Sequence, residues 1–317
     1  MADTYETLTD IGKVNDENLA DVEISDLLDD APLLAALAAE TASDGDKHKY
    51  PKETGAPVVG FRNINAGIEH TTSGDEIVTI DLKVLDASTR TDVAAAATWK
   101  KGGPLAFVAR KNRRSLKSAF ATAEKQIIYG TGNKADGFVG LADAETLDGL
   151  DDPMVVDAGG TTADTASSVY LIRTNDEGTD CTLITGMEGN ITIGETSTQE
   201  VDDAEGKHYH AYVTAILAWL GLQIGSIHSV GRIVNLTNDA GKGLTDDLIY
   251  QGLEKFPSSK QPNLIVMNRR SLGQLRKSRT ATNATGVPAP RPTEVDGIPI
   301  ICTDSIVSTE PLLAAEE

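Results

Sequence analysis

The chain has 317 residues, of which 40% are hydrophobic and 4% aromatic, and a formal net charge of -20. This length suffices for one large core or two modest ones, and the acidic balance argues against free association with nucleic acid, because phosphate binding requires a basic surface. The longest apolar run, residues 211–224, falls short of the ~20 residues that cross a bilayer, so no membrane partner is expected. The absence of a secretory signal and the unrelated settings of Cys181 and Cys302 predict a reducing cytoplasm and free thiols.

The charges are segregated along the chain. Residues 1–50 carry thirteen acids and three lysines, and residues 135–206 carry seventeen acids and one arginine. Residues 104–134 instead carry seven bases and one acid, and residues 265–280 carry five bases and no acid. Such segregation either guides one surface onto another or keeps separate faces solvated.

Residues 1–66 are predicted to form an N-terminal arm, because their polar beginning cannot make a core by itself. A helix is predicted over residues 32–40, with Pro32 in its first turn and its leucines buried. Residues 41–57, TASDGDKHKYPKETGAP, contain glycine and proline and predict a hinge without regular structure. An arm of this kind must use a partner's surface, which indicates assembly.

Residues 67–100 are predicted to form an extended loop or hairpin. Within them, residues 77–85 alternate between apolar and polar side chains, as is typical of a strand with one exposed face. We expect the outer face of this segment to meet water or another subunit.

A long helix is predicted from Leu105 to Tyr129. Pro104 suits its first turn, apolar residues recur at spacings of three and four, and Gly130 suits the left-handed position after its end. About twenty-six helical residues would span about 39 Å.

The glycines of residues 130–137, GTGNKADG, fit the loose pattern of a dinucleotide-binding loop. That pattern works where a strand precedes the glycines and a helix follows them, so that the pyrophosphate meets the helix N-terminus. Here a predicted helix precedes the glycines and no predicted helix follows. We therefore expect these glycines to end the helix and turn the chain, without a cofactor.

Short β-prone runs separated by acidic turns follow, and those between residues 168 and 236 are expected to form one sheet. Residues 208–224 could be a buried strand or a buried helix, and their β-branched and aromatic content favours a strand. Residues 241–317 predict a compact α/β lobe, in which Thr245 and Asn268 cap two helices.

No catalytic or metal-binding constellation is evident. His208 and His210 share a strand face, but a metal site needs three or four converging ligands. Cys181 and Cys302 lie in apolar or β-prone runs, where a thiol is usually packing, and no G-x-S-x-G motif is present. We expect no enzyme, no metal and no cofactor; the rival hypothesis is a cytosolic nucleotide-dependent enzyme that uses residues 130–137.

The long helix carries a dense set of bases that is a candidate subunit-contact or inner surface: Arg110, Lys111, Arg113, Arg114 and Lys117. Like charges this close repel one another, so an acidic partner is expected. The candidates are a polyanion and the acidic arm of this or an adjacent subunit, with Asp26, Asp29 and Asp30 as its contact residues. The alternative is a solvated helix surface. Because aromatic residues are few, any contact with nucleic acid would be weak and to phosphates.

The order of these segments resembles the major capsid proteins of tailed bacteriophages over residues 21–309. The similarity lies in DLLDDAPLLAAL, YPKETGAPVVGFRNIN, IIYGTGNKADGFVGL, GLQIGSIHSVGRIVNL, LIVMNRRSLGQLRK and DGIPIICTDSI.

The resemblance implies an α+β fold with an N-terminal arm, an extended loop, a peripheral domain with a long spine helix and a β-sheet over residues 101–240, and an α/β axial lobe over residues 241–317. It implies self-assembly into hexamers and pentamers of an icosahedral head that encloses double-stranded DNA, in a virion assembled in the host cytoplasm. The partners would be other copies of the chain, scaffold, portal and decoration proteins, and packaged DNA through weak non-specific contacts. A non-viral encapsulating nanocompartment is the nearest alternative. The sequence departs from many members of the fold in that the expected peripheral strands precede the axial lobe.

Overall fold

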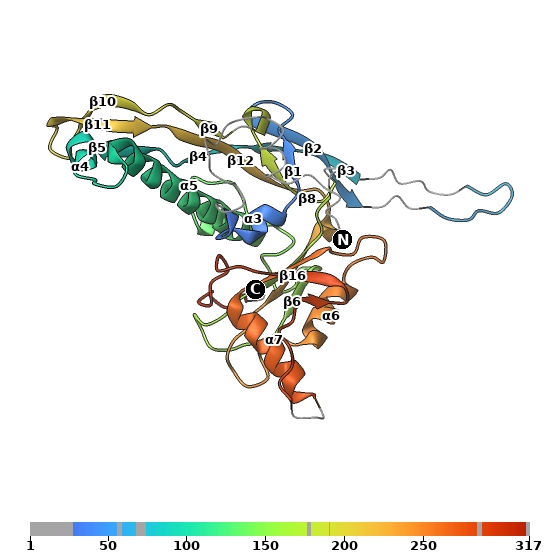
Figure 1. The fold of residues 1–317 in the computed structure, drawn as a ribbon. Helices are drawn as coiled ribbons and strands as arrows, with labels where there is room; N and C mark the ends of the chain where they lie inside the picture. The colour runs from blue at the N-terminus through green and yellow to red at the C-terminus, as the bar shows by residue number, and fades with distance from the viewer. Residues whose placement is uncertain are drawn as a thin grey trace.

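The computed structural model describes residues 28–55, 59–67, 74–175, 179–189, 191–283 and 287–314. Its helices are α3 (Pro32–Ala36), α4 (Val93–Ala97), α5 (Gly103–Tyr129), α6 (Asp246–Glu254) and α7 (Arg269–Ala281). Figure 1 shows an elongated upper part built along α5 and a compact lower part that contains α6 and α7.

The upper part holds two sheets beside α5. One has the order β1-β8-β12-β4, with β9 also paired to β12, and the other has the order β10-β11-β5. Their bounds are β1 (Ala39–Thr41), β4 (Lys83–Asp86), β5 (Thr89–Asp92), β8 (Cys181–Thr185), β9 (Thr192–Ile193), β10 (Ser197–Asp202), β11 (His208–Thr214) and β12 (Ile216–Ile224). Residues 208–224 are therefore strands, as their composition predicts.

The lower part is built on a six-stranded sheet of order β15-β16-β14-β7-β13-β6. Its strands are β6 (Val155–Asp157), β7 (Val169–Ile172), β13 (Val230–Val234), β14 (Leu264–Met267), β15 (Glu294–Val295) and β16 (Ile298–Cys302). The expectation of one sheet over residues 168–236 is wrong, because β7 and β13 lie in this sheet with β14 whereas β8 to β12 lie in the two sheets of the upper part. Hydrophobic periodicity identifies a buried strand but not its neighbours.

A fourth sheet is a separate two-stranded hairpin of β2 (Lys47–Gly55) and β3 (Gly74–Asp81). The expectation of no regular structure over residues 41–57 is therefore wrong. Pro51 lies opposite Ile77, and a two-stranded ribbon accepts a proline because each of its strands is an edge. The hairpin also crosses the position between residues 66 and 67 at which the sequence predicts the arm to end.

The alternation predicted over residues 77–85 is interrupted at Leu82. Leu82 is only 4% exposed, but the next residue predicted on the same face, Val84, is 47% exposed, and Leu85 is half-buried instead. The reason is that the chain leaves the hairpin after β3 and enters a different sheet as β4. One strand periodicity cannot continue through a change of sheet.

The helix predicted over residues 32–40 is shorter than expected. It ends at Ala36, Leu37 is extended, and residues 39–41 form β1, which pairs in parallel with β8. The backbone N–H of Ala38 donates to Thr174 Oγ1 at 3.0 Å. Tertiary pairing thus overrides a modest helix preference.

The spine helix α5 begins and ends close to the predicted residues, with a proline in its first turn and Gly130 after its end at a φ of 49°. Its buried residues recur at spacings of three and four from Leu116 to Ile127. The predicted caps of the two lower helices are also confirmed, because the side chains of Thr245 and Asn268 accept backbone N–H groups of α6 and α7.

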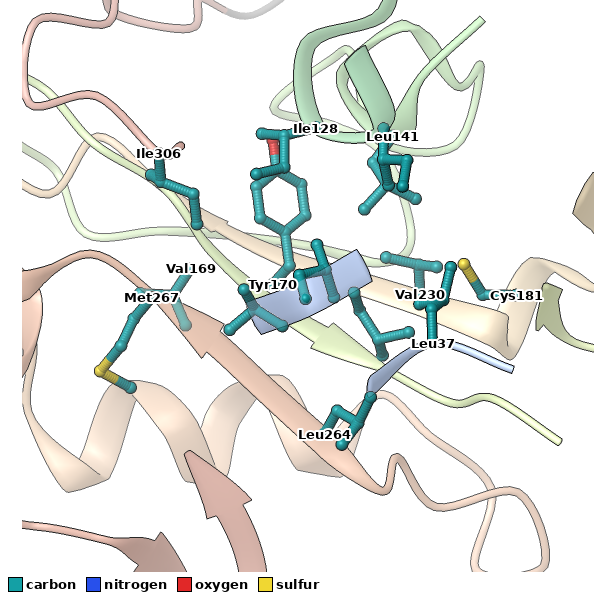
Figure 2. Packing of buried hydrophobic residues seen from close by; sticks show 14 of the residues in the cluster. Leu37, Ile128, Leu141, Val169, Tyr170, Cys181, Val230, Leu264, Met267 and Ile306 are labelled. Carbon is teal, nitrogen blue, oxygen red and sulfur yellow. The ribbon is translucent and has the colours of Figure 1, made fainter. Parts of the chain in front are cut away.

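One continuous hydrophobic core connects the two parts. It includes Leu37 after α3, Ile128 in α5, Tyr170 in β7 and Cys181 in β8, all fully buried, and Figure 2 shows these side chains packed in one region. The arm, the spine helix and both large sheets therefore depend on the same core for stability.

We expect Gly130→Ala to destabilise the subunit strongly. Its φ is positive, and an added Cβ would clash with the Asp143 carboxylate and with the backbone nitrogen of Gly140. Gly241 has a φ of 77° with nothing near its Cβ position, so Gly241→Ala is a matched control for backbone strain alone. The expected loss of unfolding free energy is about 3 kcal/mol for Gly130→Ala and about 1 kcal/mol for the control. Urea unfolding followed by circular dichroism measures both, and equal losses would contradict the steric explanation.

Candidate assembly surfaces

The five bases predicted as contact residues all lie in the first half of α5. Arg110, Lys111, Arg113 and Arg114 are exposed, and Lys117 is half-buried. The helix places them there because its apolar residues, such as Leu116 and Phe120, face the core.

Two of these bases are held against aromatic rings at the corner between α4 and α5. The guanidinium carbon of Arg110 lies 5.3 Å from the centre of the Trp99 ring, and Lys111 Nζ lies 5.2 Å from that of Phe107. The two rings are themselves 5.3 Å apart. Cation–π attraction keeps the two charges at the surface without neutralising them.

Lys117 is the predicted base that contacts a predicted acid. Its Nζ lies 3.0 Å from Asp30 Oδ2, with the two side chains 39% and 59% exposed, and a pair this exposed contributes ~1 kcal/mol or less. The contact joins the arm and the spine helix within one chain. Asp26 lies outside the described residues, and within them neither Arg113 nor Arg114 has an ion-pair partner.

Asp29 and Asp30 also line a cavity of about 710 Å³ between α5 and α7. Four bases share its wall: Lys125, Arg269, Arg276 and Arg291. With Asp304, three acids face these four bases, and the near balance of charge is consistent with a structural junction between the upper and lower parts.

An acidic hairpin lies at the same end of the upper part as α4 and the start of α5 (Figure 1). It consists of β10, β11 and the turn between them, and its exposed acids are Glu200, Asp202, Asp203 and Glu205. Asp202 contacts His208, and Glu205 contacts Lys207 at 2.6 Å. In the sequence, the acids of this hairpin are part of the acid-rich segment of residues 135–206. The position of the hairpin beside α5 depends on the pairing of β11 with β5.

A third surface is the apolar tip of the β2–β3 hairpin, which sequence reasoning did not identify. Val59, Phe61 and Ile64 are each at least 84% exposed. The available signal was the occurrence of these apolar residues in a segment rich in glycine, proline and asparagine, where no core was expected. Three large apolar side chains exposed together are typical of an interaction site.

A buried carboxylate, also missed from the sequence, fixes the arm to α5. Glu124 is 0% exposed, and its Oε2 accepts the backbone N–H groups of Leu33 at 2.7 Å and Leu34 at 3.1 Å. Its Oε1 accepts the hydroxyl of Thr303. Burial raises the pKa of Glu124, and these hydrogen bonds oppose the rise in part. Three segments distant in sequence therefore meet at one side chain.

The C-terminal segment is fixed by a second buried carboxylate. Glu310 Oε2 accepts the hydroxyl of Ser168 and Oε1 accepts that of Tyr129, both at 2.6 Å. Arg232 Nη2 lies 3.7 Å from the same carboxylate. Burial and the negative charge of Glu310 raise the pKa of Tyr129, so its hydroxyl stays protonated and donates.

The turn of residues 130–137 is filled by the protein's own groups. Gln126 Nε2 donates to the carbonyl oxygens of Gly130 at 2.7 Å and Phe138 at 2.8 Å. The Asp143 carboxylate accepts the backbone N–H of Thr131 at 2.6 Å. A carboxylate at this amide would repel a phosphate, so the arrangement does not fit a dinucleotide loop.

Three further properties of the described residues concern a buried thiol, metal ligation and membrane spanning. Burial raises the pKa of Cys181 to about 12, which makes this thiol unreactive. No three His, Cys, Asp or Glu side chains among the described residues converge to hold a metal ion. No helix within the described ranges is long and apolar enough to span a bilayer.

Comparisons with known proteins give two kinds of match. The profile of the protein family described as Major capsid protein GP7 matches residues 16–314, and no curated protein sequence matches the chain.

A chain from the structure of bacteriophage Epsilon15 is 20% identical, with 100% of this chain and 99% of that chain covered and a TM-score of 0.63. The bacteriophage JBD30 capsid is 11% identical over 84% and 88% of the two chains, with a TM-score of 0.46. The SrpI encapsulin complex from Synechococcus elongatus PCC 7942 is 8% identical over 65% and 87%, with a TM-score of 0.40. The Epsilon15 similarity shows a shared fold.

We expect Glu124→Ala to lower the unfolding free energy by on the order of 3 kcal/mol, because it leaves buried N–H and hydroxyl donors without an acceptor. Glu145 is exposed, so Glu145→Ala is the matched control and should cost less than about 0.5 kcal/mol. Urea unfolding of both variants measures the difference. Similar small losses for the two variants would show that the buried carboxylate does not hold the arm.

The raised pKa of Glu124 also predicts a pH dependence. Because the folded protein binds this proton more readily than the unfolded chain does, wild type should gain stability relative to Glu124→Gln as the pH falls through the raised pKa. The gain should be complete below the ordinary value of 4.5. The measurement is the difference in unfolding free energy between the two proteins from about pH 8 to about pH 4. A difference that stays constant or shrinks towards low pH would contradict the assignment.

Proposed function

Because the chain belongs to the Major capsid protein GP7 family, we propose that its exposed hairpin tip and charged faces are the contacts through which copies of it assemble into a phage head. The protein is a structural capsid protein with the tailed-phage capsid fold, and it is not an enzyme. It assembles with other copies of itself into capsomers and is part of the virion. The finer contacts of that assembly are the subject of the proposal.

The observation that carries the proposal is the β2–β3 hairpin. It projects from the upper part, on the side away from α4 (Figure 1), and its tip exposes Val59, Phe61 and Ile64. Burying an apolar side chain of this size contributes about 1.5–3 kcal/mol, which is a strong reason for the tip to contact another copy of the chain. A contact between unlike surfaces of two copies closes into a ring when the rotation permits it.

This hairpin also supports a revised division of the chain. The extended loop corresponds to residues 47–81, which include β2 and β3, in place of residues 67–100. The sheets beside α5 form the peripheral domain, and the six-stranded sheet with α6 and α7 forms the axial domain. We propose a division that follows strand pairing instead of one at residue 240, and the pairing of β6, β7 and β13 in the six-stranded sheet supports it.

The bases of α5 form a second contact surface in this proposal. Arg110, Lys111, Arg113 and Arg114 crowd the exposed first half of the helix, and four like charges in so short a segment favour an acidic partner. Lys117 differs from them because it pairs with Asp30 of the same chain. The acids Asp29 and Asp30 then support the arm on its own subunit.

The remaining partners follow from the family. The subunits would form the hexamers and pentamers of an icosahedral shell around double-stranded DNA, assembled in the host cytoplasm with scaffold, portal and decoration proteins. The net charge of -20 keeps contact with the genome weak and non-specific, since repulsion leaves packaged DNA mobile. Tight, salt-sensitive binding of DNA by the isolated subunit would contradict this last point.

The test of the function is expression of the full chain with and without the adjacent genes, followed by negative-stain electron microscopy and size-exclusion chromatography. Closed shells, or rings and tubes of capsomer size, are the expected products. A discrete monomer or dimer under every condition would contradict assembly through these surfaces. Portal, terminase and scaffold genes beside this one would favour the phage head, and an enzyme cargo gene would favour a nanocompartment.

We expect Phe61→Ser to reduce the yield of closed shells by roughly tenfold or more, since a lost apolar contact of about 1.5 kcal/mol recurs in every subunit. Subunit unfolding should be unchanged, because Phe61 is fully exposed. Val287 is an exposed apolar residue of the lower part, and Val287→Ser is the matched control. Sedimentation of assembled particles measures the yield, and an equal yield from Phe61→Ser and wild type would remove the tip from the interface.

A further inference from the structure

The end of the upper part that contains α4 carries two surfaces of opposite charge close together, the bases of α5 and the acidic hairpin. The bases of α5 begin one helix after β5, and β5 pairs with β11 of the acidic hairpin in a register that sets Asp92 opposite Ala211. The positions of the two surfaces are therefore fixed relative to each other by secondary structure. The side chains of both surfaces are exposed in one chain, and Figure 1 shows β10, β11 and the start of α5 at the same end of the upper part.

The acidic hairpin keeps an excess of negative charge after its internal contacts are counted. Lys207 contacts Glu205, and His208 contacts Asp202. Asp203 accepts the backbone N–H groups of Glu205 and Lys207, which shapes the turn without adding a positive charge. Glu200 lies opposite His210 on β11, and the four acids of the hairpin are all exposed.

The basic surface keeps an excess of positive charge. Neither Arg113 nor Arg114 has an ion-pair partner within the described residues, and the ring contacts of Arg110 and Lys111 leave both charges intact. Lys117 is different, because Asp30 of its own chain already compensates it. The unmatched positive charge thus lies in the part of α5 nearest to α4.

From this juxtaposition we infer that the acidic β10–β11 hairpin of one subunit binds the Arg113–Arg114 face of α5 in a second copy of the chain. The two surfaces carry opposite charge, and no ion pair joins them inside the described part of one chain. The contact is between unlike surfaces, so each subunit can donate its hairpin and accept another. The inference rests on the proposed function and names the partner of its basic surface.

Two other occupants fit the observations less well. The arm reaches α5 at Lys117 through Asp30 of the same chain, which is farther along the helix than the uncompensated arginines. A nucleic acid would approach an end of the molecule that also carries the four exposed acids of the hairpin, and these would repel phosphates.

The test is a charge exchange in the full chain. Each variant is expressed with the same adjacent genes that the wild-type protein requires for assembly. Arg113→Glu with Arg114→Glu, and Glu200→Lys with Glu205→Lys, each bring like charges together at the contact. Each double variant should lower the yield of closed particles by roughly tenfold at low salt, and the combined exchange should restore it to within about twofold of wild type. The loss should be smaller at high salt, because the contact is exposed and therefore screened.

Three controls separate the outcomes. Lys134 follows α5 and Lys277 lies on α7, and both are exposed, so Lys134→Glu with Lys277→Glu makes the same change in net charge away from the contact and should assemble normally. Unfolding of every variant subunit should match wild type. If wild type itself forms no particles, the proposed function fails, whereas wild-type assembly without rescue by the exchange overturns only the hairpin assignment.

The remaining results also decide between partners. If Arg113→Glu with Arg114→Glu is rescued by Asp26→Lys with Asp29→Lys and not by the hairpin exchange, the arm is the partner and the inference is wrong. If the arginine variant assembles normally but its particles package less DNA, the surface faces the genome and the inference is again wrong.

Discussion

The buried carboxylate of Glu124 is the interaction on which the arrangement of the molecule depends. It sits on the spine helix, accepts two backbone N–H groups from the start of α3 and accepts the hydroxyl of Thr303 after β16. A carboxylate with 0% exposure is tolerated only if donors replace its water, so each of these segments must be in place for the others to be stable. Glu310 does the same for the C-terminal segment and Tyr129.

Because the core and these buried carboxylates stabilise the subunit, its hairpin tip and charged surfaces can remain without partners in a single chain. The core that links α3, α5 and both large sheets is continuous, so the subunit does not need its hairpin tip or its charged end for stability. Val59, Phe61 and Ile64 stay exposed, and the arginines of α5 stay without acidic partners within the described residues. Surfaces of this kind cost little in a monomer with a stable core and contribute their free energy when several copies meet.

The sequence predicted local features well where a short segment contains the whole cause. The limits of α5 follow from a proline, an apolar spacing and Gly130, and the caps at Thr245 and Asn268 follow from side chains that bond within three residues. The candidate site was predicted in part: the bases of α5 are where the sequence places them, whereas Glu124 and the hairpin tip were missed. The role of Glu124 depends on segments about 90 or more residues distant, and that of the hairpin tip on its exposure among the described residues.

The sequence by itself determined the acidic balance, the spine helix, the absence of a phosphate loop at residues 130–137 and, through the order of its segments, the family. Tertiary structure alone decided which strands pair: residues 47–55 became half of a hairpin in spite of Pro51, and β7 and β13 joined the lower sheet with β14. The physical reason is that a helix makes its hydrogen bonds within one segment, while a strand makes them with a neighbour that its own sequence does not specify.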